Sequence, residues 1–160
     1  MAVPMLATPP LVPVAELTVT VGQPVEAGAV TGAETRGQRR IIPITGGSVR
    51  GCLTGRVLAG GADFQMIVSP TMAVLDARYV LALDSGEHVY VQNHALRRGS
   101  AEAIARLARG EPVDPAAIYF RCAPRFEVSS TALGWLTESL FIGTGARFPD
   151  RVELAIFRVA

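Results

Sequence analysis

The sequence predicts an all-β protein that forms a single antiparallel β-barrel with one short α-helix. Nine segments are rich in β-branched, aliphatic and aromatic residues, and most are bounded by Gly, Pro, Asp or Asn. Only one segment has the apolar spacing of a helix. Hydrophobic residues make up 49% of the 160 residues and charged residues 18%, which is enough apolar material for one core in one domain.

The expected strands follow one another at hairpin spacing, which is typical of a barrel or a sandwich. Segment 74–83 favours the barrel. Its Leu75 and Tyr79 point to one face and its Asp76 and Arg78 to the other, yet apolar residues dominate both faces near its end. This pattern suits a closed barrel whose outer surface is partly covered. In chain order, the expected strands are residues 17–21, 39–45, 54–58, 64–68, 74–83, 88–93, 118–122, 140–143 and 152–159.

Glycine-containing segments predict where the chain reverses between these strands. Residues 84–87 (DSGE) have the composition of a hairpin turn in which Gly86 supplies the positive φ. The Gly pairs at 46–47 and 60–61 mark two further reversals or bulges.

One segment has the signals of a helix. Ser100 is a suitable N-cap for the stretch AEAIARLAR, Ile104 and Leu107 belong to its apolar stripe, and Gly110 ends it. A second short turn is expected at residues 132–136.

The charged and catalytic residue types exclude several functions. The 15 basic residues nearly balance the 14 acidic ones, so the charge predicts neither nucleic acid nor a membrane as a partner. All the basic residues are Arg, and the absence of Lys excludes Schiff-base catalysis and a P-loop of the GK[ST] type. There is no GxSxG, HExxH or Rossmann GxGxxG motif, and the Cys and His residues lack metal-site spacing. We therefore expect neither a cofactor nor a metal site.

Residues 1–15 predict an extended arm in front of a barrel domain at 16–160. Four Pro residues interrupt the arm and no basic region opens it, so we expect neither a signal peptide nor a membrane span, and hence a cytoplasmic protein. The arm is apolar and has no charged side chain before Glu16. Because a monomer would leave this surface exposed, we expect a homodimer or a higher homo-oligomer. The alternative is an arm that folds back over its own barrel.

Six strings of the sequence occur together in a characteristic order and spacing: GQRRIIPITGG (37–47), GRVLAGGADFQ (55–65), DARYVL (76–81), VYVQN (89–93), ARGEPVDPAAIYFRCAPRFE (108–127) and WLTESLFIGTG (135–145). Over roughly residues 16–159 the chain thereby resembles the domain of unknown function 3237 family of bacterial and fungal β-barrel proteins, of the UPF0311 type. The resemblance implies an antiparallel barrel, calycin-like or like that of allene oxide cyclase, that usually self-associates and has no established reaction.

Asp63 and Gln65 form the first candidate site. They follow the Gly60-Gly61 turn and are two residues apart, so they share one strand face. A carboxylate beside a closely approaching backbone can act as a general base, with Gln65 binding the ligand. The alternative is that Asp63 caps the turn by accepting backbone N–H groups.

Arg78, Arg121 and Tyr119 are candidate ligand-binding residues. Arg78 shares a face with Asp76, whereas Tyr119 and Arg121 share a face on a later, apolar strand. If these faces line the barrel, the two Arg side chains would hold a carboxylate or an enolate by bidentate contacts. The alternative is an exposed ion pair of small energetic value.

The remaining candidates are Tyr79, Tyr90 and Asn93. A Tyr hydroxyl beside an Asn amide can donate to an oxyanion, so Tyr90 and Asn93 are assigned catalytic roles and Tyr79 a ligand-binding one. The alternative is that both Tyr residues are core residues and that Asn93 ends its strand.

A mostly apolar chain with a few polar residues on strands is typical of a ligand pocket. We therefore expect a small ligand that is hydrophobic or aromatic. The candidate Arg residues indicate that it also carries an acidic group. The leading hypothesis is cofactor-independent acid/base chemistry on a carbonyl compound of this kind, as an isomerase, hydratase, cyclase or lyase. A non-catalytic ligand-binding barrel and a structural homo-oligomer remain as alternatives.

Overall fold

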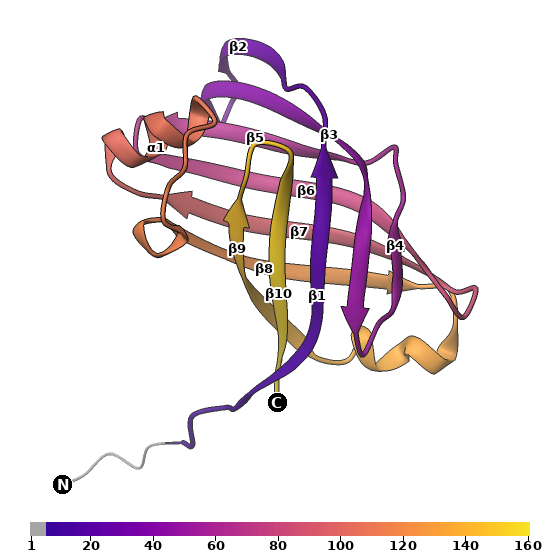
Figure 1. Cartoon of the computed structure of the whole chain (residues 1–160). Helices are drawn as coiled ribbons and strands as arrows, with labels where there is room; N and C mark the ends of the chain where they lie inside the picture. The colour runs from indigo at the N-terminus through magenta and orange to yellow at the C-terminus, as the bar shows by residue number, and fades with distance from the viewer. Residues whose placement is uncertain (1–5) are drawn as a thin grey trace, which may run out of the picture.

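The computed structural model describes residues 6–160, and the predicted all-β architecture is confirmed (Figure 1). The strands are β1 (Leu11–Val21), β2 (Val25–Thr31), β3 (Arg36–Gly51), β4 (Gly55–Val57), β5 (Ala62–Ser69), β6 (Met72–Leu83), β7 (His88–Arg98), β8 (Tyr119–Val128), β9 (Leu140–Arg147) and β10 (Arg151–Val159). The helical elements are the α-helix α1 (Ala101–Ala108) and the 3-10 helices η1 (Pro115–Ala117) and η2 (Thr131–Leu136).

The strands close into an antiparallel barrel with eight strand positions. From β6 to β10, each strand pairs with the next one along the chain. β1 then pairs with β10 on one side and with β3 on the other, which closes the ring. β4 and β5 share one position, because both lie between β3 and β6. Closure gives the barrel an interior that is separated from solvent by the sheet.

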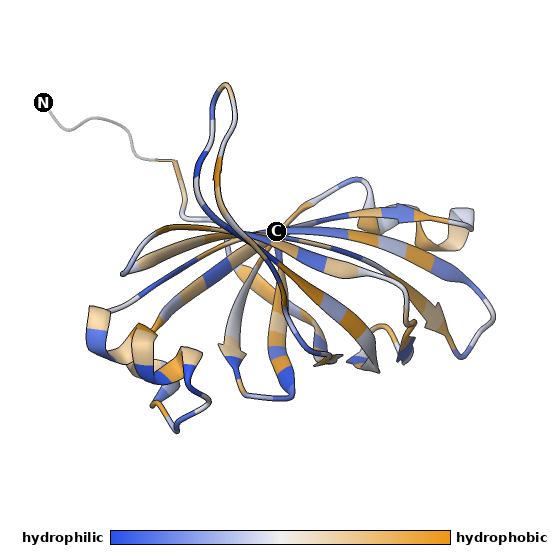
Figure 2. Cartoon of the chain, turned by 90° about the horizontal axis from the view of Figure 1, so that it is seen from above, coloured by the Kyte–Doolittle hydropathy of each residue, from blue (hydrophilic) through white to orange (hydrophobic). Residues whose placement is uncertain are grey.

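Hydrophobic and hydrophilic residues alternate along the barrel strands (Figure 2). Successive side chains of a strand point to opposite faces, so alternate residues line the interior. On β6 and β7, for example, Leu75, Tyr79, Val89 and Val91 are all at most 4% exposed. The parity of a residue along its strand therefore decides whether it can belong to an interior site.

β3 is long because it changes partners at the Gly46-Gly47 pair. Its first half pairs with β2 and β5, and its second half with β1 and β4. Gly47 has a φ of +134°, and a Cβ atom at this position would overlap the carbonyl oxygen of Thr18. The pairing of β1 with β3 shifts its register beside this Gly pair, between Thr20 and Val21, so the Gly pair lies at a bulge, one of the two predicted alternatives, where β3 changes partners.

The two ends of the barrel are covered differently (Figure 1). At one end, η2 inserts Leu133 and Leu136 into the core. At the other end lies α1, whose N-cap Ser100 accepts a hydrogen bond from the Ala103 amide at 3.1 Å, as predicted. No residue of α1 is fully buried, so the end beside α1 is the less tightly closed one.

Several element boundaries differ from the prediction. β1 begins at Leu11, within the expected 1–15 arm, because Leu11 pairs with Val159. The first five residues of that arm lie outside the described residues. β2 was not predicted, and β7 continues beyond Asn93 to Arg98. Among residues 6–160, no helix is long and apolar enough to cross a membrane.

Candidate functional site

A cavity of about 80 Å³ lies inside the barrel. Its walls are mostly apolar and include Val19, Ile42, Ile44, Leu75, Phe120 and Leu154. Six polar or charged side chains also line it, namely Asp63, Gln65, Tyr79, Asn93, Arg97 and Arg147. One water molecule needs about 10–15 Å³ of such space. The cavity therefore suits several waters or a small organic ligand.

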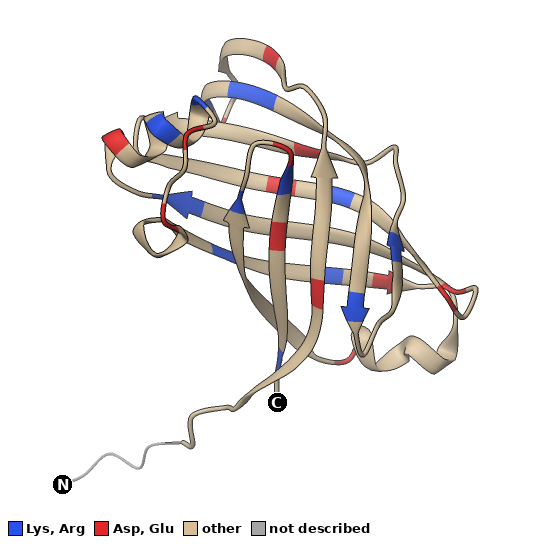
Figure 3. Ribbon diagram, in the orientation of Figure 1, with Lys and Arg blue, Asp and Glu red and all other residues tan. Residues whose placement is uncertain are grey.

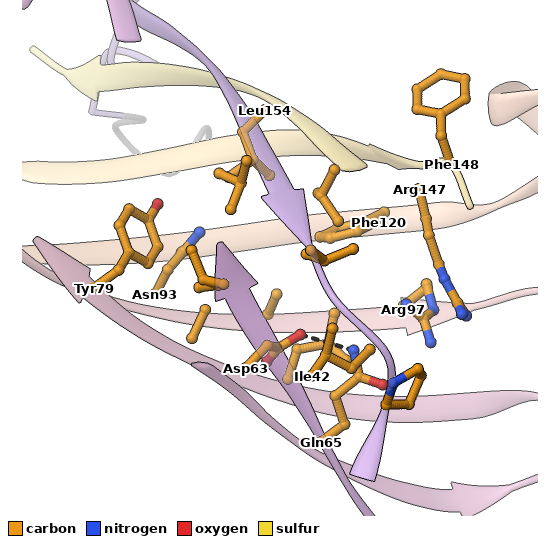
Figure 4. Close-up of a pocket in the computed structure, with 18 of the residues that line it drawn as sticks. Ile42, Asp63, Gln65, Tyr79, Asn93, Arg97, Phe120, Arg147, Phe148 and Leu154 are labelled. Carbon is orange, nitrogen blue, oxygen red and sulfur yellow. Dashed lines mark hydrogen bonds between the residues drawn. The ribbon is translucent and has the colours of Figure 1, made fainter. Parts of the chain in front are cut away.

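Asp63 enters the cavity just after the chain leaves β4 for β5. Gly60 has a φ of +107° and allows the chain to turn between these two strands. Gly61 lies directly against the backbone of Arg78. Asp63 Oδ2 accepts a hydrogen bond from Gln65 Nε2 at 2.7 Å (Figure 4). Asp63 Oδ1 accepts one from the Asp76 amide of β6 at 3.1 Å. The carboxyl group therefore bonds a neighbouring strand and does not cap its own turn.

Burial raises the pKa of Asp63 above its ordinary value, because a charged carboxylate is poorly solvated in this apolar cavity. The hydrogen bond from Gln65 and the positive charge of Arg97 oppose this rise without cancelling it. A carboxyl group with a raised pKa is suited to exchange a proton near neutral pH.

Two buried amide oxygens of the site have no hydrogen-bond partner within the described chain. They are Gln65 Oε1 and Asn93 Oδ1, on residues that are only 2% and 5% exposed. Because an unsatisfied buried acceptor is costly, such atoms usually bind a ligand or an ordered water.

Tyr79 and Asn93 form the inner end of the cavity (Figure 4). Both also line a small void of about 10 Å³ deeper in the barrel, next to Leu81 and Phe126. Burial raises the pKa of the Tyr79 hydroxyl, and the charges of Cys122 and Asp63 add to this rise. Tyr79 is therefore a neutral hydroxyl that can donate a hydrogen bond.

Arg97 and Arg147 lie close together at the opposite end of the cavity (Figure 4). Burial, together with the positive charge of Arg147, lowers the pKa of Arg97 to about 10. Burial also lowers the pKa of Arg147, and the charge of Arg40 contributes to this effect. Both guanidinium groups still carry their charge at neutral pH. Neither residue is among those predicted from the sequence.

The sequence contained a signal for Arg97. Arg97 and Asn93 are four residues apart on β7, so they share a face. Arg97 was not predicted because the expected strand ended at residue 93. Arg147 has a weaker signal, since it follows the glycines of β9 and is the last residue of that strand.

Four predicted site residues lie on the outer surface and cannot contact a ligand in this cavity. Tyr90 is three residues from Asn93, so it points to the opposite face of β7. Arg78 forms an exposed ion pair with Asp76, 3.0 Å apart on the outer face of β6. Tyr119 and Arg121 are exposed on β8, where Arg121 lies 5.2 Å from the Tyr119 ring centroid. The exposed alternative therefore holds for Arg78.

The described residues contain no cluster of three or more His, Cys, Asp or Glu side chains placed to bind a metal. Cys122 is buried on the interior face of β8, whereas Cys52 is exposed.

Comparisons with known proteins agree with the fold. Residues 9–159 match the family model described as protein of unknown function (DUF3237). A UPF0311 protein from Bradyrhizobium diazoefficiens is 46% identical over 143 residues, covering 89% of this chain and 91% of that protein. The match thus covers most of both sequences.

Solved structures show the same likeness. A conserved protein of unknown function from Rhodopseudomonas palustris is 42% identical, with a TM-score of 0.89 over 98% of this chain and 100% of that one. A β-barrel-like protein from Acinetobacter baumannii is 38% identical, with a TM-score of 0.81 over the same shares. An enzyme from Penicillium herquei shares the fold. It is 16% identical, with a TM-score of 0.69 over 99% of this chain and 100% of that one. The chain therefore belongs to the DUF3237 family of β-barrel proteins.

Proposed function

We propose that the barrel interior binds a small hydrophobic or aromatic carbonyl compound and moves a proton on it, with Asp63 as the general acid or base. The observation that carries this proposal is the Asp63 carboxyl group itself. It faces an apolar cavity, its pKa is raised, and two hydrogen bonds fix its position. Distant resemblance to a protein described as an enzyme is compatible with turnover.

In an isomerisation, the Asp63 carboxylate would remove a proton from the carbon next to the carbonyl group. The electron pair left behind moves onto the carbonyl oxygen and forms an enolate, which the Tyr79 hydroxyl or the Asn93 amide can stabilise by donating a hydrogen bond. Asp63 then returns the same proton to a different carbon. In a lyase reaction the same carbon would lose its proton, and the enolate would then expel a leaving group from the adjacent carbon. In a hydratase reaction Asp63 would instead take a proton from the attacking water, and the enolate formed by the addition would be protonated at carbon.

The second candidate function is ligand binding without turnover. It is favoured by the unpartnered oxygens of Gln65 and Asn93, because these groups suit a bound ligand whether or not it reacts.

The test is a panel of aromatic acids and enones, assayed with the wild type, Asp63→Asn and the control Asp84→Asn. Asp84 lies in the exposed turn after β6. We expect Asp63→Asn to lower kcat/KM by about 10²–10⁴ while the fold is retained, and Asp84→Asn to have no effect.

Unchanged turnover in Asp63→Asn would contradict the assigned role. Saturable binding without turnover would support the second candidate. Neither binding nor turnover would indicate a structural homo-oligomer.

A further inference from the structure

We propose that Arg97 and Arg147 form an oxyanion-binding subsite, and that the ligand of this barrel is therefore an acid: a carboxylate or phosphate group on an otherwise apolar body. This inference rests on the proposed ligand-binding cavity but not on any turnover there. It replaces Arg78 and Arg121, which lie outside the barrel, with two side chains inside it.

The first argument is charge balance. Arg97 is only 5% exposed, and its side chain forms no ion pair with a carboxylate of residues 6–160. Arg147 likewise has no ion-pair partner in this range. Buried charges in folded proteins are nearly always paired, because an isolated charge is poorly solvated there. Arg97 is buried and Arg147 is half-buried, and neither has a counter-ion among residues 6–160. A ligand can supply this counter-ion.

The nearby charged groups do not neutralise them. Arg40 adds a third positive charge, although it is paired with Glu26, with 2.7 Å between Nε and Oε1. Asp63 is near enough for its charge to raise the pKa of both arginines. Its two oxygens, however, are bonded to Gln65 and to the Asp76 amide, and burial favours its protonated form.

The fold concentrates these positive charges at one place. β3, β7 and β9 each bring a basic segment to the end of the barrel beside α1 (Figure 3). The same three arginines line a second cavity of about 270 Å³ beneath the Ile104 and Leu107 side chains of α1. An anion can thus reach the arginines from the less tightly closed end.

The geometry and surroundings indicate the chemical class. A guanidinium group presents planar, paired N–H donors that match the two oxygens of a carboxylate or a phosphate. Beyond the arginines, the cavity walls are mostly aliphatic and aromatic, with Asp63, Gln65, Tyr79 and Asn93 as the polar exceptions, so the rest of the ligand must be largely apolar. The buried Gln65 Oε1, without a partner among the described residues, offers an additional acceptor for a ligand hydroxyl or N–H group.

The experiment is calorimetric titration of the full chain with benzoate, benzyl phosphate and the neutral benzamide. We expect at least one of the two anions to bind about tenfold or more tightly than benzamide, since charge-assisted hydrogen bonds are the strong ones. Which anion binds more tightly distinguishes a carboxylate ligand from a phosphate ligand.

Arg97→Gln and Arg147→Gln should each weaken binding of the preferred anion about tenfold or more and leave benzamide binding unchanged. The matched control is Arg98→Gln, because Arg98 is the exposed neighbour of Arg97 and contacts the outer Tyr119 ring. Equal binding of anions and benzamide, unaltered anion binding in the Arg97 and Arg147 variants, or no anion binding at all would overturn the proposal.

Arg97→Met gives a second readout that does not require an added ligand. Because the buried charge is unpaired, replacing it with an apolar side chain of similar length should raise the Tm of the free protein. Benzoate or benzyl phosphate should raise the Tm of the wild type but not that of Arg97→Met. A lower Tm for Arg97→Met would show that the charge is already satisfied within the fold and would count against the subsite.

Asp63→Asn separates this inference from the proposed function. It should bind the anion at least as tightly as the wild type, because it removes a negative charge near the arginines, while losing turnover. If the arginine variants lose binding and Asp63→Asn remains active, the catalytic role of Asp63 fails and the oxyanion subsite stands.

Discussion

Asp63 makes the stability of the barrel depend on pH. Burial raises its pKa in the folded state above the ordinary value of 3.8, so the fold prefers the protonated carboxyl group. The stabilisation that this preference provides is fully present below pH 3.8 and is lost as the pH rises through the folded-state pKa.

We therefore expect Asp63→Asn, which cannot ionise, to gain stability relative to the wild type as the pH rises from 3.8 towards neutrality. Urea unfolding of both proteins at a series of pH values measures this difference. Asp84→Asn serves as the control for a surface carboxylate. A difference between Asp63→Asn and the wild type that does not change with pH would contradict the raised pKa.

Only some of the residues that form the site could be predicted from the sequence. Asp63 and Gln65 were predicted because residues two apart on a strand share one face, whatever the exact ends of that strand. Tyr90 and Asn93 were grouped although their spacing of three places them on opposite faces. Arg97 was missed because RRG looks like a loop, and nothing local to it shows that its partners come from β3 and β9.

Among the elements, β3 depends on the Gly pair at its bulge. Gly47 combines a positive φ with a position where a Cβ atom would overlap Thr18 O, whereas Gly60 has a φ of +107° and no atom within 4 Å of that position. Gly47→Ala should therefore destabilise the barrel more than Gly60→Ala, by about 1–3 kcal/mol, because only the first adds a steric overlap to the backbone strain.

Chemical denaturation of the two glycine variants and the wild type gives this comparison directly. Equal losses of stability would mean that the bulge of β3 adapts to a side chain at no extra cost.

Elements with strong local signals were predicted, and those that depend on a distant partner were not. α1 was found because its N-cap and apolar stripe lie within ten or so residues of chain. β2 was missed because its sequence, VEAGAVT, is small and weakly apolar, and it is held as a strand by pairing with β3. The division of one strand position between β4 and β5 likewise depends on both neighbours.

At the scale of the whole molecule, an apolar patch extends over three adjacent strands on the outer surface. Cross-strand pairing places Leu11, Val159 and Leu140 in one row, and Pro13, Phe157 and Ile142 in the next. Leu140 is 78% exposed and Leu11 49%. A patch of this kind is typical of an interface, and the self-association that we expect would cover it with a second copy of the chain.

We expect light scattering at micromolar concentration to give a mass above the 16.9 kDa of the single chain. Leu140→Glu should shift the protein towards the monomer, because a charge in a buried interface is costly. Val25→Glu is the control, since Val25 is also exposed but lies on β2, outside the patch. A monomeric wild type, or equal behaviour of the two variants, would refute this interface.

The hydrogen bond between Asp63 and the Asp76 amide has one more consequence. Asp76 contributes its backbone N–H to the interior acid, while its own side chain is paired with Arg78 on the outer face of the barrel. One residue thus spans the wall of the sheet. The amide resonance of Asp76 should follow the titration of Asp63, and its solvent exchange should quicken when Asp63 becomes protonated and accepts less strongly. The barrel wall thereby carries a built-in spectroscopic reporter, readable on the free protein, of the proton held inside.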